Sequence, residues 1–159
     1  MIDTLHTLLS APGRTDVDVQ LKILQIVSSL LVTYANVTSE LLSRALMLCF
    51  TLYEHSRVVV VSSTAAAMLR QNVMVVFEKV QSEDQSFDAI QNEDAAVNAP
   101  LPVGTAELPS GPVTLFPCAA DVYHLLNDLC ALADGQPAQF LPLDTLSKPF
   151  VLELLESVL

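Results

Sequence analysis

Basic residues are scarce in this 159-residue sequence, which has seven Lys and Arg against eighteen Asp and Glu and a formal net charge of −11. A protein that binds nucleic acid needs clustered Lys and Arg to neutralise phosphates. The composition therefore excludes a nucleic-acid partner. The scarcity is also uneven: residues 1–79 balance their charges, whereas residues 80–159 contain Lys148 as their single basic residue and carry the whole net charge.

Glycine, histidine and cysteine are too few or too scattered to indicate a site for a cofactor or a metal. The four glycines form neither a GxGxxG motif nor a P-loop, and the three histidines lie far apart. The cysteines Cys49, Cys118 and Cys130 form no CxxC pair, and their apolar neighbours are typical of small buried hydrophobic residues. We therefore expect no cofactor, no metal and no catalytic residues, and we expect that the chain is not an enzyme.

His124 lies between two acids at helical spacing and comes nearest to a reactive site. Asp121 and Asp128 stand three and four residues from it, so all three side chains share one helix surface. Charged residues at this spacing more often form a solvated helix face than a catalytic site. We interpret the three residues as a solvated face.

Charged residues make up only 16% of the chain, whereas hydrophobic residues make up 52%. Intrinsic disorder requires the reverse balance, so the chain should fold around a core. Its length suits one core, which predicts a single domain over residues 1–159. The first residues contain no basic region of a signal peptide, and the charge-free stretch at 23–39 is too short and too polar to span a bilayer. Free cysteines without a leader favour a cytosolic location.

Apolar residues recur at spacings of three and four along most of the chain, which predicts amphipathic helices. The valine run at 58–61 favours a strand locally, but no second strand signal is present to pair with it. The short joint after Asn36 predicts that the helices on either side of it are antiparallel neighbours. The expected helices cover about residues 2–9, 19–34, 39–53, 58–81, 118–133 and 148–158.

The helical pattern disappears between residues 83 and 117. This stretch has six acids, five prolines and no Lys or Arg, so it cannot bury enough apolar surface to offset its ordering entropy. We expect an acidic, proline-containing disordered insertion here. Helix pairs stacked in series without a sheet then predict an all-α solenoid of antiparallel helices with one long disordered loop.

One face of the helix at 58–81 has a composition that suits contact with another surface. Ala67, Arg70, Gln71 and Met74 lie roughly opposite the apolar stripe of that helix. They could form a second packing surface within the domain, which is the simpler hypothesis. They could also form a partner-binding face, because Arg and Met are enriched at interfaces.

Two segments carry a resemblance to a known family. Residues 63–80, STAAAMLRQNVMVVFEKV, resemble the N-terminal helix of the large Golgi Arf exchange factors and their relatives. Residues 121–159 resemble a segment of the same family in which an Asp-Leu-Cys-x-Leu helix leads to a Lys-x-Phe-x-Leu-Glu-Leu-Leu-Glu-Ser helix; here these motifs begin at Asp128 and Lys148. The Arg70-Gln71 pair is most similar to the Mon-two (monensin-sensitivity) scaffold branch, which lacks the catalytic domain.

The resemblance identifies the region as a dimerisation and cyclophilin-binding (DCB) domain. It implies an armadillo/HEAT-like regulatory domain that self-associates, docks on the adjacent domain of the full-length protein, or binds a GTP-loaded Arf-like small GTPase. It also implies a cytoplasmic protein, peripheral on trans-Golgi and endosomal membranes, whose membrane contact is indirect. These implications come from the family and not from composition or spacing.

Two hypotheses about function follow. The first is a non-catalytic interaction module of a Golgi and endosome vesicle-trafficking scaffold, with Ala67, Arg70, Gln71 and Met74 meeting a protein partner. The alternative is a purely structural helical-repeat unit that has no partner of its own.

Overall fold

The computed structural model describes residues 4, 16–34, 37–90, 101–108 and 111–158. Five helices and a small sheet follow one another in this part of the chain. Their bounds are α2 (Val17–Thr33), α3 (Ser39–His55), α4 (Val59–Ile90), β1 (Gly104–Leu108), β2 (Gly111–Leu115), α5 (Pro117–Ala133) and α6 (Lys148–Glu156). The helix predicted at 2–9 lies outside the described residues apart from Thr4.

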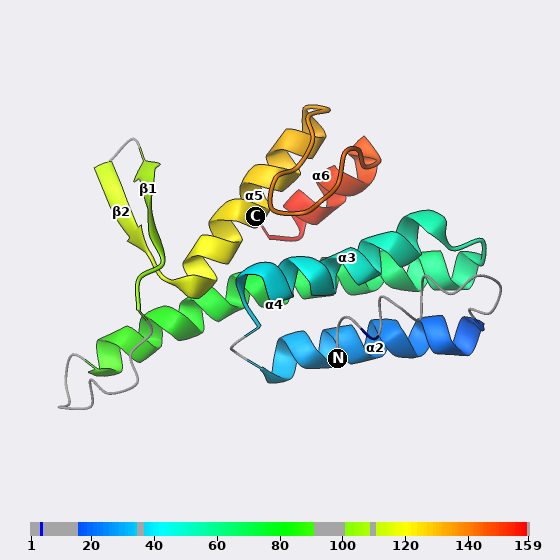
Figure 1. The fold of residues 1–159 in the computed structure, drawn as a ribbon, viewed down its shortest axis with the longest axis horizontal. Helices are drawn as coiled ribbons and strands as arrows, with labels where there is room; N and C mark the ends of the chain where they lie inside the picture. The colour runs from blue at the N-terminus through cyan, green and yellow to red at the C-terminus, as the bar shows by residue number, and fades with distance from the viewer. Residues whose placement is uncertain (1–3, 5–15, 35–36, 91–100, 109–110, 159) are drawn as a thin grey trace.

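The first three of these helices enclose most of the core; α3 runs antiparallel to both α2 and α4, so α2 and α4 point the same way (Figure 1). Their buried faces are the predicted apolar stripes, with Leu24, Leu46 and Leu69 among the fully buried side chains. Asp16 caps α2, because its carboxylate accepts a hydrogen bond from the Asp18 N–H at 3.4 Å. The antiparallel packing predicted from the short joint is confirmed.

A buried polar cluster links the three helices inside this core. The Ser28 hydroxyl of α2 donates to Asn72 Oδ1 of α4 at 2.8 Å and lies 2.9 Å from the Met68 sulfur. The Asn72 amide donates in turn to the Cys49 sulfur of α3 at 3.7 Å. Asn72 is fully buried. Because a buried polar group needs its partners, this cluster favours one register of the three helices over any slipped arrangement.

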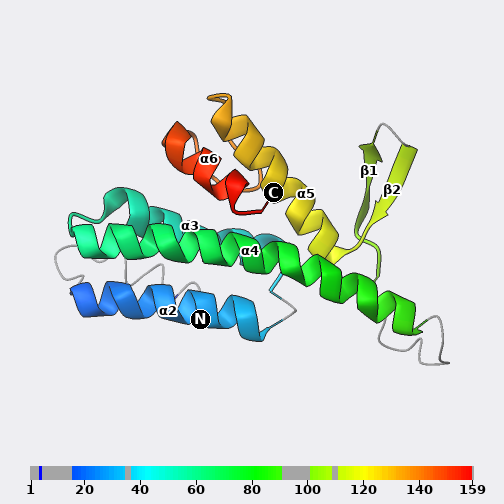
Figure 2. The ribbon, with the colours of Figure 1, turned by 180° about the vertical axis from the view of Figure 1, so that it is seen from behind.

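Helices α5 and α6 pack together on the other side of α4 from α2 (Figures 1 and 2). Pro117 opens α5, where its missing N–H costs nothing, and Gly135 follows its end with a positive φ of 75°. The connection to α6 is held from inside, since the Asp128 carboxylate accepts hydrogen bonds from the N–H groups of Gln139 at 2.8 Å and Leu141 at 2.6 Å. The helices predicted after Pro117 and Ser147 are confirmed.

The disordered insertion predicted at 83–117 is wrong for the described part of that stretch. Helix α4 continues to Ile90, and residues 104–108 and 111–115 form an antiparallel hairpin in which Thr105 is opposite Thr114. The all-α fold class is confirmed for the described residues, although this small two-stranded sheet was not expected. Extending a nucleated helix fixes one residue per added hydrogen bond, so α4 can continue through polar sequence once its apolar part is packed.

Glu83 gives that extension a second role. Its carboxylate accepts hydrogen bonds from the first free N–H groups of α5, those of Cys118 at 3.1 Å and Ala119 at 3.2 Å. The negative charge also lies at the positive end of the α5 dipole. The polar end of α4 is therefore held against the start of α5 by these two hydrogen bonds.

The bonds of Asp128 predict a marked loss of stability when that side chain is truncated. Asp128→Ala leaves two backbone N–H groups without their acceptor, and its site is only 4% exposed. We expect the free energy of unfolding to fall by about 2–3 kcal/mol, measured by urea denaturation. Asp144→Ala, at an exposed acid in the same connection, is the control and should change it by less than about 0.5 kcal/mol. Equal effects of the two substitutions would contradict the role given to Asp128.

Candidate protein-interaction surfaces

The four residues selected from the sequence lie on α4, and three of them are exposed. Ala67, Gln71 and Met74 face solvent, and the Met74 side chain is 44% exposed. Together with Arg70 at its edge, we call this surface the α4 face. The structure therefore brings the predicted residues together on one side of one helix.

Arg70 differs from the other three because it has a partner within the chain. Its Nη1 donates to Glu153 Oε2 of α6 at 2.7 Å, and the two side chains are 39% and 53% exposed. Ion pairs at this degree of exposure contribute little to stability, typically below about 1 kcal/mol. Arg70 can therefore exchange Glu153 for an acid of a partner at a small cost in stability.

An aromatic pair lies beside this ion pair. Tyr53 of α3 stacks on Phe150 of α6 with ring centroids 4.2 Å apart. Partial burial raises the pKa of the Tyr53 hydroxyl, and the neighbouring carboxylates of Glu153 and Glu54 raise it further. The stack joins α6 to α3, and α3 packs on α4, so Glu153 of α6 is held within reach of Arg70.

These contacts divide the α4 face. Arg70 takes part in packing α6 against α4, as the simpler hypothesis expects for all four residues. Ala67, Gln71 and Met74 have no such role in the described contacts and leave a weakly charged, partly apolar surface open. The assignment of these residues to partner binding stays a prediction.

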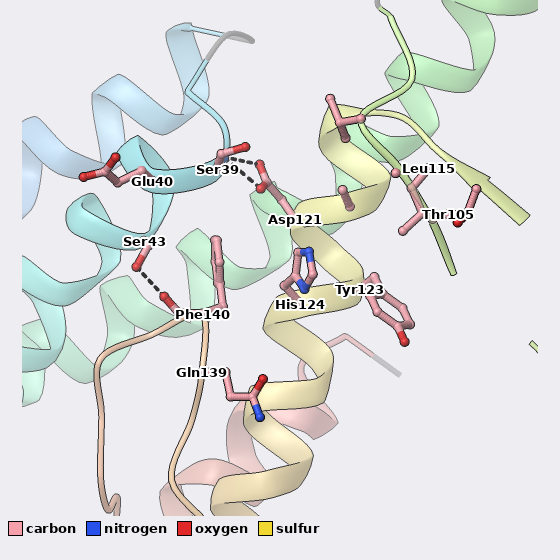
Figure 3. A pocket seen from close by; sticks show the side chains of 13 residues that line it. Ser39, Glu40, Ser43, Thr105, Leu115, Asp121, Tyr123, His124, Gln139 and Phe140 are labelled. Atoms are coloured by element: carbon pink, nitrogen blue, oxygen red, sulfur yellow. Dashed lines mark hydrogen bonds between the residues drawn. The ribbon is translucent and has the colours of Figure 1, made fainter. Parts of the chain in front are cut away.

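A second surface, which sequence reasoning missed, is a groove across α5 (Figure 3). It has a volume of about 610 Å³. One wall is the base of the hairpin, and the other is the start of α3 with the connection before α6. The groove, which we call the α5 groove, is lined by Ser39, Glu40, Ser43, Val103, Gly104, Thr105, Leu115, Ala120, Asp121, Tyr123, His124, Gln139 and Phe140.

Asp121 fixes the inner wall of the α5 groove. Its two carboxylate oxygens accept hydrogen bonds from the Ser39 N–H, at 2.8 and 3.0 Å, at the start of α3 (Figure 3). The residue is 2% exposed, and this burial raises its pKa to about 6. The Ser39 N–H, His124 and Lys79 act in the opposite direction and stabilise the carboxylate.

The solvated face predicted for Asp121, His124 and Asp128 is wrong for both acids. Asp121 and Asp128 are buried and accept backbone hydrogen bonds from other parts of the fold. Only His124 is exposed, and its ring stacks on Phe140 with centroids 5.9 Å apart. Helical spacing gives the shared face of the three residues correctly, but it cannot show that another segment covers part of that face.

The cysteines are also less uniform than expected. Cys49 is buried, which raises its pKa to about 12, whereas Cys118 is half-buried and Cys130 is exposed. The pKa of Cys118 is raised to about 11, by burial first and then by Glu83. The Cys49 and Cys118 thiols therefore stay protonated at neutral pH and are poor nucleophiles.

Two further observations concern metals and membranes. Within the described ranges, no three His, Cys, Asp or Glu side chains are grouped so that they could hold a metal ion.

Of the described helices, α4 is long and apolar enough over Val59–Gln85 to cross a membrane by length and composition. Its apolar side packs on α2, α3 and α5, which is the position of a central core helix.

Stacked helices with an open α4 face and a groove across α5 define an all-α helical domain. The chain belongs to the Mon2/Sec7/BIG1-like dimerisation and cyclophilin-binding domain family, whose profile matches residues 1–84. The resemblance found in the sequence is thereby confirmed.

The relatives place the chain in one branch of that family. It is 41% identical to the MON2 homolog of Xenopus laevis and 40% identical to that of Homo sapiens, in each case over 88% of this chain. It is 35% identical to the MON2 homolog of Caenorhabditis briggsae over 97% of this chain. The matched region spans only 8–10% of these three relatives. No solved structure matches the chain.

The raised pKa of Asp121 predicts a pH-dependent contribution to stability. A carboxyl whose folded pKa lies above its unfolded value binds its proton more tightly in the folded protein, so the contribution is complete below about pH 4 and is lost as the pH rises through about 6. Relative to Asp121→Asn, the wild type should therefore lose unfolding free energy between about pH 4 and 7.

A carbon-detected NMR titration of the Asp121 carboxyl measures the same group directly. We expect a midpoint near 6 in the folded protein and near 4 in denaturing urea, which serves as the control. A folded midpoint at or below the unfolded one would contradict the assignment.

The partial exposure of the Arg70–Glu153 pair predicts weak coupling. A double-mutant cycle with Arg70→Ala and Glu153→Ala should give an interaction energy of about 0.2–1 kcal/mol, measured by urea denaturation at low salt. The exposed pair Glu40 and Arg44, whose charged atoms lie 3.9 Å apart, provides a comparison cycle and should give less. A coupling well above 2 kcal/mol would show that the pair is a major structural contact.

Proposed function

We propose that this domain is a non-catalytic interaction module of a vesicle-trafficking scaffold related to the large Arf exchange factors. Membership of a family described as a dimerisation and cyclophilin-binding domain carries the proposal. The relatives named MON2 homolog support the scaffold branch of that family. The chain spans less than a tenth of the length of the first two relatives. The trafficking role of the full-length protein is therefore proposed together with the role of this domain.

The α4 face is the contact surface that we assign to this function. Ala67 and Gln71 are exposed and uncharged, and Met74 adds a flexible apolar side chain that adapts to a partner. These three side chains carry no charge, so a partner that covers them removes no charged group from water. Arg70 can add an ionic contact if a partner acid replaces Glu153.

The partners that we propose are proteins of three kinds. A second copy of the domain would give a homodimer, an adjacent domain of the full-length protein would give an internal contact, and an Arf-like small GTPase in its GTP-bound form would give a nucleotide-dependent one. We further propose a cytoplasmic location, peripheral on trans-Golgi and endosomal membranes, with membrane contact made through the partners.

A matched pair of substitutions tests the α4 face. Met74→Asp places a charge at the centre of the face, whereas Ile26→Asp places one on α2 at nearly the same exposure, 40% against 44%. We expect Met74→Asp to weaken capture of a GTP-loaded Arf-like protein, or self-association in sedimentation, by about tenfold or more, because a charge at an interface centre must be desolvated. Ile26→Asp should leave both unchanged, and both variants should melt near the wild-type temperature.

The outcomes separate the versions of the proposal. Equal capture of the GTP-loaded and GDP-loaded forms contradicts the nucleotide-dependent version, and a monomer at high concentration contradicts self-association through this region. If Met74→Asp lowers the melting temperature and changes no binding, the alternative of a purely structural helical-repeat unit is supported instead.

A further inference from the structure

The α5 groove meets the hairpin at the edge of one strand. Three consecutive residues line it, Val103 just before β1 and then Gly104 and Thr105 within it, whereas β2 contributes only Leu115. Because consecutive side chains of a strand point to opposite faces, a cavity that touches three residues in a row approaches the strand from its edge. The edge of β1 is therefore one wall of the groove.

Pro112 indicates which backbone groups point to that edge. Pro112 is opposite Glu107 in the hairpin and has no N–H, so this pair belongs to positions whose backbone groups point away from the partner strand. Thr105 and Thr114 are opposite each other two residues further along, and the alternation of an antiparallel ladder gives them the same orientation. The Leu115 oxygen accepts a hydrogen bond at 2.9 Å from the N–H of Val103, which lies just before β1, so the Leu115 carbonyl points toward β1, as a hydrogen-bonded pair of Gly104 and Leu115 requires.

The two edges of the hairpin consequently differ. On β1 the N–H and C=O of Thr105 point toward the groove, whereas on β2 the missing donor of Pro112 interrupts the outer edge. A two-stranded hairpin is marginally stable alone, and a third strand would add main-chain hydrogen bonds. Such a strand can add on the groove side.

Space and charge in the groove favour one kind of occupant. A Cβ added to Gly104 would have no heavy atom within 4 Å, so the β1 wall is open. The charged groups of the lining are Glu40 and Asp121, and the lining includes no Lys or Arg. Glu40 keeps 84% of its side chain exposed and has Arg44 3.9 Å away, which leaves it free to pair with a second cation. Phe140 and Tyr123 add aromatic surface.

We propose that the α5 groove binds an extended peptide segment of another protein, which adds to β1 as a third strand and alternates cationic with apolar side chains. The main-chain bonds are made to Thr105, a Lys or Arg of the peptide pairs with Glu40, and an apolar side chain covers Phe140. This surface is separate from the α4 face, since no residue lines both. It therefore goes beyond the function proposed above.

The test uses a fluorescent eight-residue peptide of alternating valine and lysine and two relatives of it. In one relative glutamate replaces lysine, and in the other alternate backbone nitrogens are methylated on the strand-facing side. We expect the lysine peptide to bind the whole chain in an anisotropy titration. Both relatives should bind at least about tenfold more weakly, the first through charge and the second because one or two main-chain hydrogen bonds are lost.

Two proline substitutions at opposite positions provide the matched variants. Thr105→Pro removes a donor from the groove edge, and Thr114→Pro removes one from the outer edge of the same hairpin. We expect the first to weaken binding of the lysine peptide by about tenfold or more and the second by less than about twofold. Gly104→Val, which fills open space on a strand, should also block the peptide without lowering the melting temperature.

Several results would overturn the proposal. These are no binding of the lysine peptide up to millimolar concentration, equal binding of the glutamate or methylated peptide, and equal effects of the two proline substitutions in folded protein. If Thr105→Pro unfolds the hairpin, Gly104→Val decides alone, and unchanged binding by that variant rejects the groove as the site.

Discussion

The hydrogen bonds between Asp121 and Ser39 are the contact on which the arrangement of the two helix groups depends. Ser39 begins α3 with a positive φ of 52°, a conformation that costs a residue with a side chain about 1 kcal/mol or more. The side chain of Thr38 does not cap the helix. The carboxylate of Asp121 on α5 takes that role instead, by accepting from the Ser39 N–H. The start of α3 and the second turn of α5 are thereby fixed to each other.

The same principle recurs at two other joints. Glu83 of α4 accepts from the first turn of α5, and Asp128 of α5 accepts from the connection before α6. In each case a carboxylate at one element satisfies N–H groups that the other element cannot pair for itself. The net charge of −11 is therefore a poor guide to the surface, since three of the acids that contribute to it hold the fold together.

The sequence was sufficient to predict the described helices, apart from the polar end of α4 beyond residue 81, because their apolar stripes repeat regularly and their ends carry local signals such as Asp16, Pro117 and Gly135. It was insufficient for the hairpin, since Pro112 and two nearby glycines hide a short alternation of Thr114 with Val113 and Leu115. The α5 groove could not be predicted for a different reason. Its walls come from segments up to a hundred residues apart, and no local spacing records that Asp121 reaches Ser39.

The position of Asp121 also explains why the groove and the α4 face can act independently. The carboxylate binds α3 on one side of α5, and Glu83 binds α5 on the side of α4. The start of α5, which follows β2, is therefore held on two sides by contacts that do not involve Ala67, Gln71 or Met74. A partner on the α4 face would displace at most the exposed Arg70–Glu153 pair, whose loss costs little. The geometry of the groove would then persist, and one domain could hold two different partners at the same time.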